Sequence, residues 1–212
     1  MTYKIGFVSQ KGGCGKSTLA RLLAREVAVN NMSIKIADMD LKQSTSSRWV
    51  GRRAENGIEP TIRSETFADV KTALSESNNF DFFIFDGAPH ASIQTKEIAQ
   101  VVDLIVIPTG QSVDDLEPAV LLAHDLFKSG IPIKNIVFAL MKVTGSESEI
   151  QSAREYLAST PYQVLNGAIP TKTSYSQALD VGKSINEVSF KGLHNKADEL
   201  AQSIIDAVAE LV

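Results

Sequence analysis

The sequence of 212 residues contains little cysteine, no long apolar run and no large excess of either charge. Its one cysteine, Cys14, excludes an internal disulfide and a metal cluster held by several cysteines of one chain, and is typical of a reducing cytosol. No apolar run approaches the roughly 20 residues of a membrane-spanning helix. We expect no signal peptide, because the short apolar segment that opens the chain has no basic flank. The net charge of −4 argues against a wholly basic nucleic-acid-binding protein but allows a local basic face.

The composition is that of a globular protein, with 43% hydrophobic and 22% charged residues. Apolar runs predict strands at 3–8, 33–37, 61–63, 80–86, 101–108, 136–141 and 163–169. Apolar residues at helical spacing predict helices at 17–29, 48–56, 67–77, 113–129, 148–159, 174–181 and 193–211. Strands and helices alternate without a repeat or a linker. We therefore expect one α/β domain over residues 1–212, a mostly parallel twisted sheet with helices on both faces.

A glycine-rich segment, S-Q-K-G-G-C-G-K-S-T at 9–18, joins the first predicted strand to the first predicted helix. Its glycines allow main-chain N–H groups to turn toward an anion, and the helix adds its positive N-terminal end. A glycine-rich turn without a ligand is disfavoured by this strand–loop–helix context. We predict that Lys16 binds the outer phosphates of a nucleotide and that Ser17 offers its hydroxyl to Mg²⁺. The predicted phosphate-binding residues are Gly12, Gly13, Cys14, Gly15, Lys16, Ser17 and Thr18, with Cys14 a small filler rather than a redox switch.

Carboxylates follow two of the predicted strands. Asp86 ends a nearly continuous apolar strand and opens the sequence D-G-A-P, which fits a carboxylate that holds Mg²⁺ beside a phosphate-binding loop. Asp38 and Asp40 follow another strand, and the alternation of side chains points them the same way. The alternatives are a capping or turn role for Asp86 and a solvated loop for the other two. Ser17 and Asp86 are the metal-site residues that the pattern itself predicts.

The loop resembles the deviant Walker A motif of the ParA/MinD family of ATPases. The general pattern G-x-x-x-x-G-K-[ST] would place a glycine at position 10, where this chain has Gln10, and the form K-G-G-x-G-K-[ST] adds Lys11. The resemblance implies a P-loop NTPase fold of the deviant Walker A type and Mg²⁺-dependent hydrolysis of ATP to ADP and phosphate. It also implies that Lys11 reaches the nucleotide of a second subunit in an ATP-bound homodimer.

The resemblance extends to residues outside the loop. The segment I-A-D-M-D-L-K-Q-S is similar to the family's D-x-D-P-Q switch, which implies that Asp40 places the attacking water and that Asp38 supports the metal and the loop. This chain departs from that pattern, because Leu41-Lys42 precedes Gln43. Lys11, Lys16 and Asp40 are thus the implied catalytic residues. The residues implied to flank the adenine are Met141 with Lys142, and Pro170 with Thr171.

The sequence also bears on the partners that such an ATPase would use. Lys172, Lys183 and Lys191 are candidates for non-specific DNA contacts, with ordinary solvated charge as the alternative. A second basic cluster, at Arg48, Arg52 and Arg53, is interpreted as a solvated face or a partner surface. The C-terminal helix carries acidic charges, which disfavours a MinD-like attachment to anionic lipid. An electron-transfer role like that of nitrogenase iron protein would need further cysteines.

The resemblance favours a ParA-type ATPase for plasmid or chromosome partition. It implies an ATP-dependent sandwich dimer on non-specific DNA, a centromere-binding adaptor of the ParB/ParG type that stimulates hydrolysis, and a cytoplasmic, nucleoid-associated location without membrane contact. One alternative is a relative that positions a protein cargo, such as a chemotaxis cluster or a carboxysome, and a lesser one is a MinD-like membrane-associated ATPase. Another is a nucleotide-binding module without useful turnover.

Overall fold

The computed structural model describes residues 2–90 and 92–211. Within them lies a seven-stranded sheet formed by β1 (Tyr3–Phe7), β2 (Ile34–Asp38), β3 (Arg63–Thr66), β4 (Phe82–Asp86), β5 (Leu104–Thr109), β6 (Ile136–Val143) and β7 (Gln163–Pro170). The helices are α1 (Lys16–Val29), α2 (Thr45–Glu55), α3 (Val70–Glu76), α4 (Ser92–Val101), α5 (Val113–Lys128), α6 (Glu147–Ala158), α7 (Thr173–Asp180) and α8 (Lys191–Ala209). Short 3₁₀ turns are η1 (Ser77–Asn79), η2 (Ile133–Asn135) and η3 (Ile185–Glu187).

The strands lie in the order β3-β2-β4-β1-β5-β6-β7, and every neighbouring pair is parallel. The register places Phe7 and Asp38 directly opposite Asp86 on either side of β4. The ends of β1, β2 and β4 are therefore level, and the loops that follow them meet at one edge of the sheet. This carboxyl edge is where open α/β sheets bind ligands.

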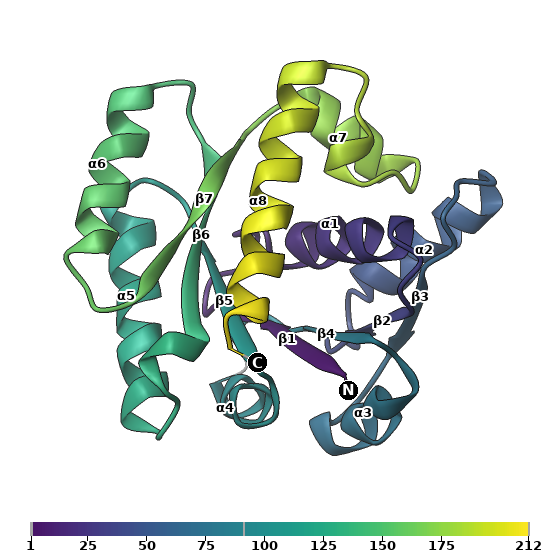
Figure 1. Cartoon of the computed structure of the whole chain (residues 1–212), viewed down its shortest axis with the longest axis horizontal. Coiled ribbons are helices and arrows are strands. Elements are labelled where there is room, and N and C mark those ends of the chain that lie inside the picture. The colour runs from purple at the N-terminus through teal and green to yellow at the C-terminus, as the bar shows by residue number, and fades with distance from the viewer. Residues whose placement is uncertain (1, 91, 212) are drawn as a thin grey trace.

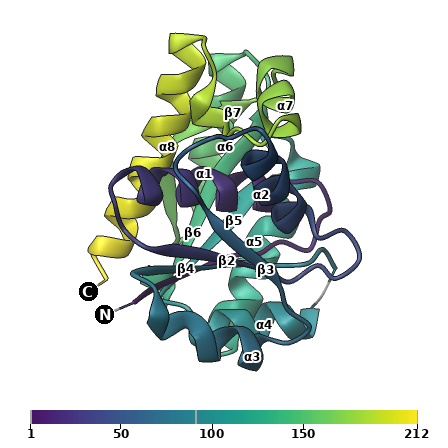
Figure 2. The same ribbon diagram turned by 90° about the vertical axis from the view of Figure 1, so that its right-hand side faces the viewer.

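Helices cover both faces of the sheet, with α1, α2, α7 and α8 on one side and α3, α4, α5 and α6 on the other (Figures 1 and 2). Each face has its own apolar core, represented by Leu22 and Trp49 on the first and by Phe83 and Leu126 on the second. The central strands are buried on both faces, which explains their nearly continuous apolar sequences. A fully buried leucine such as Leu22 contributes about 1.5–3 kcal/mol through transfer from water.

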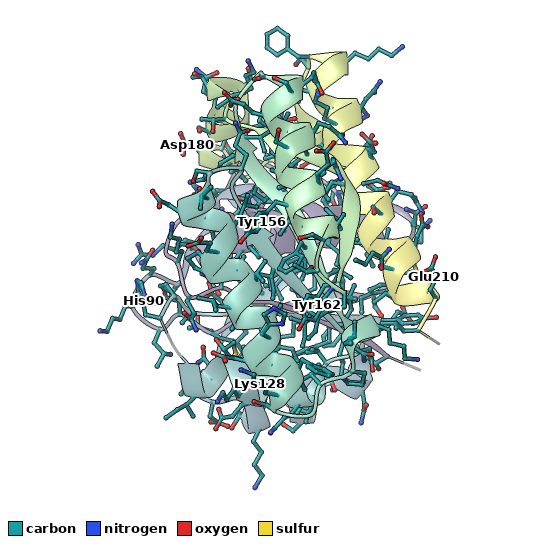
Figure 3. All side chains as sticks on the ribbon, turned by 90° about the vertical axis from the view of Figure 1, so that its left-hand side faces the viewer. His90, Lys128, Tyr156, Tyr162, Asp180 and Glu210 are labelled. Carbon is teal, nitrogen blue, oxygen red and sulfur yellow. The ribbon has the colours of Figure 1, made fainter. Side chains whose placement is uncertain are left out.

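The outer helices α5 and α6 are shown face-on in Figure 3, where His90 and Glu210 mark opposite sides of the molecule. Tyr162, labelled there, directly precedes β7 and shares a hydrogen bond of 2.9 Å with Nδ1 of His124 on α5. Along the described residues, no helix combines the length and apolarity needed to cross a membrane.

The fold class is confirmed, and several elements differ from the prediction. Strand β3 spans Arg63–Thr66 rather than 61–63, and α3 begins at Val70 rather than at 67. Helix α4 was not predicted, because little more than Ile98 and Ala99 of its sequence is buried and the apolar period is weak. Val101, predicted as the start of a strand, ends that helix instead. Helix α2 begins at Thr45 rather than at the predicted residue 48, because the carboxylate of Asp38 accepts the N–H groups of Ser46 and Ser47 in its first turn.

Candidate functional site

The glycine-rich loop connects β1 to α1 at the carboxyl edge. Gly13 and Gly15 have φ of 73° and 114°, a region that side chains disfavour. A Cβ at Gly15 would also lie 2.9 Å from Cε of Met141, which packs under the loop with 2% exposure. The structure thus places Met141 as a support of the loop, while the base contact implied for it stays a prediction.

A cavity of about 260 Å³ lies above the loop. It brings together predicted residues from three strand ends, namely Gly12, Gly13, Gly15, Lys16, Ser17, Thr18, Asp40 and Asp86. Its other lining residues are Arg21, Gln43, Thr45, Gly87, Pro89 and Lys142. Lys11, Cys14, Asp38, Met141, Pro170 and Thr171 are not among the lining residues.

The two lysines of the loop occupy different environments. Lys16 is buried, and its Nζ donates a hydrogen bond of 3.3 Å to the carbonyl of Lys11. Lys11 instead extends toward the start of α5, where its Nζ lies 2.8 Å from Oδ1 of Asp115 and also donates to the carbonyl of Asp114. Ser112 Oγ donates to the second oxygen of the same Asp115 carboxylate, at 2.8 Å. The Lys11 contact lowers the pKa of Asp115 below its usual value.

Asp86 is buried at the tip of β4, between the loop and α2. Its Oδ2 accepts a hydrogen bond of 2.7 Å from Ser46 Oγ, whereas its Oδ1 is buried without a hydrogen-bond partner. The pKa of Asp86 is raised to about 6. Burial is the main cause and the nearby charge of Asp38 adds to it, whereas the hydroxyls of Ser46 and Ser17 and the charge of Arg21 oppose the shift. Burial also lowers the pKa of the neighbouring Arg21.

Asp38 caps the N-terminus of α2 from the adjacent strand. Its Oδ2 accepts the N–H groups of Ser46 at 2.8 Å and Ser47 at 3.1 Å, and its Oδ1 accepts the N–H of Asp40 at 3.2 Å. Asp40 in turn uses Oδ1 to accept the N–H groups of Lys42 and Gln43, at 3.0 Å each. The carboxylates therefore organise the segment that follows β2, and a direct metal role for Asp38 stays a prediction.

The segment near the predicted adenine contacts is also ordered by main-chain bonds. Thr171 donates through its N–H to the carbonyl of Val143 at 3.1 Å and through Oγ1 to that of Lys142 at 3.3 Å. Lys142 has a φ of 55° and lines the cavity. The ends of β6 and β7 are thus held together, and the base contacts implied for Pro170 and Thr171 stay a prediction.

The candidate DNA-binding lysines lie apart from the cavity. Lys172, Lys183 and Lys191 are exposed, and Lys172 shares a separate hollow with Phe190 and Lys196. The arginine cluster behaves differently, because Arg53 is 1% exposed and forms an ion pair with Glu187. The interpretation of a solvated arginine face is therefore wrong for Arg53.

Ser46, Thr45 and Arg21 are the site residues that sequence reasoning missed. Ser46 and Thr45 precede the predicted helix at 48–56, so they were not placed in the site. In the structure Thr45 Oγ1 donates to Ser17 Oγ at 3.1 Å. The available signal was S-T-S-S after the acidic pair, since serine and threonine favour the first turn of a helix. Arg21 lies in the predicted first helix and was given no role, yet it is 7% exposed and lines the cavity.

Known structures share this architecture over almost the whole chain. MinD of Pyrococcus horikoshii, complexed with Mg-ADP, superposes with a TM-score of 0.76 at 16% identity, covering 100% of this chain and 99% of the other. A protein of Borrelia burgdorferi assigned as a plasmid partition protein, bound to AMPPNP, also gives 0.76, at 15% identity and 97% and 99% coverage. At these identities the likeness shows the fold.

Sequence comparison gives one relative and one family. An iron–sulfur cluster carrier protein of Saccharolobus solfataricus is 28% identical over 132 residues, which are 47% of this chain and 45% of the relative. The match thus spans less than half the length of that curated relative. The model of the CobQ/CobB/MinD/ParA nucleotide-binding domain matches residues 5–185, which is most of the chain. Together with the loop, its two lysines and the acidic strand ends, this match shows that the chain belongs to the CobQ/CobB/MinD/ParA nucleotide-binding family.

Proposed function

We propose that the chain is a Mg²⁺-dependent ParA-type ATPase that serves partition of plasmid or chromosomal DNA. The observation that carries this proposal is the place of Lys11. The Lys11 side chain does not line the cavity of its own chain. It lies beside the start of α5 and is 42% exposed. A lysine there is available to the nucleotide of a second subunit, as the deviant loop implies.

The cavity supplies the groups that ATP and Mg²⁺ require. Lys16 and the main-chain N–H groups of the loop bind the phosphates, and the N-terminus of α1 favours their negative charge. Ser17 and the unpartnered Oδ1 of Asp86 are hard oxygen ligands of the kind that Mg²⁺ prefers, so the residues present fit the ion. When bound, Mg²⁺ neutralises charge on the phosphates. Asp40 lines the same cavity and orients the attacking water.

Dimerisation would join two such sites. Each Lys11 then stabilises negative charge on the other subunit's phosphates in the transition state, so that an isolated subunit hydrolyses ATP slowly. Hydrolysis, stimulated by an adaptor bound to the centromere, returns the subunits to monomers. Lys172, Lys183 and Lys191 provide sequence-blind contacts with DNA phosphates.

The test is ATP-dependent retention of non-specific duplex DNA, measured over a range of salt concentrations. We expect retention with ATP, loss with ADP, and a marked loss when Lys172, Lys183 and Lys191 are all changed to Ala. The matched control changes Lys71, Lys128 and Lys134, which are also exposed but lie on other elements, namely α3, the end of α5 and η2. Equal retention by the two triple variants would reject the DNA face, and absence of any ATP effect would reject the partition role.

A further inference from the structure

Ser46 is fully buried in the first turn of α2, and its hydroxyl faces charged groups on two other elements. Its Oγ donates to Oδ2 of Asp86 at 2.7 Å and accepts from Nε of Arg21 at 3.4 Å. One serine hydroxyl thus links the strand tip to α1. A buried neutral group bonded to a carboxylate in this way stabilises one orientation of that carboxylate.

The backbone around Ser46 is itself fixed. Asp38 accepts the N–H groups of Ser46 and Ser47, which holds the first turn of α2 against β2. Further along the helix, Nε1 of Trp49 donates to the carbonyl of Lys183 at 3.0 Å, and Arg53 pairs with Glu187 at 2.6 Å. With both ends of α2 anchored, the Ser46 hydroxyl cannot move away from Asp86 without breaking buried contacts.

This arrangement distinguishes the two oxygens of Asp86. Oδ2 is occupied by Ser46, while Oδ1 has no hydrogen-bond partner, and Asp86 shares the lining of the cavity with Ser17. We infer that Ser46 is a positioning residue for the divalent cation: its hydroxyl holds Oδ2 of Asp86 so that Oδ1 is presented to the ion beside Ser17. This inference rests on the proposed ATPase function. It assigns the orientation of the ion's carboxylate ligand, Asp86, to a residue outside the loop.

Ser47 provides a matched control on the same helix. Its N–H also donates to the Asp38 carboxylate, but its hydroxyl lies 3.2 Å from Ser64 Oγ and 3.1 Å from Thr66 Oγ1 on β3. Ser47→Ala therefore removes one partly buried hydroxyl from the first turn of α2 and leaves the contacts of Asp86 unchanged. Any general effect of a serine-to-alanine change on α2 appears in both variants.

The experiment measures binding of fluorescent ADP by the full chain, in EDTA and across a Mg²⁺ titration. For Ser46→Ala we expect unchanged affinity in EDTA and a Mg²⁺ midpoint raised by about 10- to 100-fold, the usual effect of losing a residue that orients a metal ligand. Ser47→Ala should match the wild type in both arms. Circular dichroism checks folding, and Ser46→Cys, whose thiol is a weak donor of similar size, replaces the alanine variant if that variant does not fold.

Two results would overturn the inference. A Mg²⁺ midpoint for Ser46→Ala equal to that of Ser47→Ala would show that Asp86 is oriented without the hydroxyl. An equal loss of affinity with and without Mg²⁺ would show a purely structural role. In both cases the wild type still responds to Mg²⁺, so the proposed ATPase stands. If wild-type ADP binding shows no response to Mg²⁺, the inference and the proposed function fail together.

Discussion

Replacement of Asp115 by Asn should make ATP-dependent dimerisation stronger. In the single chain the Asp115 carboxylate holds Lys11 at 2.8 Å, and in the proposed dimer Lys11 leaves it. Both side chains are more than a third exposed, at 42% and 37%, so solvent weakens the pair to about 0.5–1 kcal/mol. Two subunits release two such pairs, which gives about 1–2 kcal/mol, or a dimer dissociation constant lowered by roughly 5- to 30-fold.

The measurement is sedimentation velocity with ATP over a range of protein concentrations, in an Asp40→Ala background that slows hydrolysis. Asp114→Asn is the matched control, because Asp114 lies in the same first turn of α5 but contacts Lys11 only through its main-chain carbonyl. Both changes remove one negative charge near the helix N-terminus, so their effects on the helix dipole are alike. Equal dissociation constants for the two variants, or weaker dimers for Asp115→Asn, would refute the reasoning.

Four further outcomes are expected. Lys16→Ala should abolish ATP binding in calorimetry, and unchanged affinity would reject its phosphate role. Asp40→Ala should bind ATP yet accumulate as a dimer in size-exclusion chromatography, because hydrolysis alone is lost; a monomer with ATP would contradict this. Arg53→Met should lower the free energy of unfolding in urea by about 1–3 kcal/mol, because the largely buried Glu187 loses its 2.6 Å partner and keeps the more distant Arg25 at 3.8 Å; no measurable loss would indicate a pair that solvent already weakens. The pKa of Asp86 is raised to about 6, chiefly by burial, and protons compete with Mg²⁺ for its carboxylate, so the Mg²⁺ midpoint for ADP binding should be constant well above pH 6 and rise steadily below it; a flat profile would contradict this.

The sequence predicted the parts of the fold that local patterns control. Continuous apolar strands and amphipathic helices can be recognised without knowledge of their neighbours, as at β4 and α5. Helix α4 was missed because its buried residues are few, and the start of α2 was missed because Asp38, on another element, caps it. Tertiary contacts of this kind override local preference and leave no periodic signal.

In the candidate site, too, the features set by local sequence were predicted and those set by tertiary contacts were not. The loop residues and Asp86 were predicted because glycine spacing and an acidic strand end are local features, and the cavity brings Gly13, Lys16 and Asp86 together. The contacts that orient them could not be predicted. Ser46 meets Asp86 across 40 positions of sequence and Lys11 meets Asp115 across 104, and only the register of the sheet brings each pair into contact.

Helix α2 packs against both the site residues and the segment that carries Lys183 and Glu187. Its first turn contacts the acidic strand ends through Ser46, and its last turns contact the segment that carries Lys183, through Trp49 and the Arg53–Glu187 pair. Gly182 has no room for a Cβ, which would lie 2.3 Å from the main-chain nitrogen of Arg53. Close backbone packing and a buried ion pair resist independent movement of the two segments.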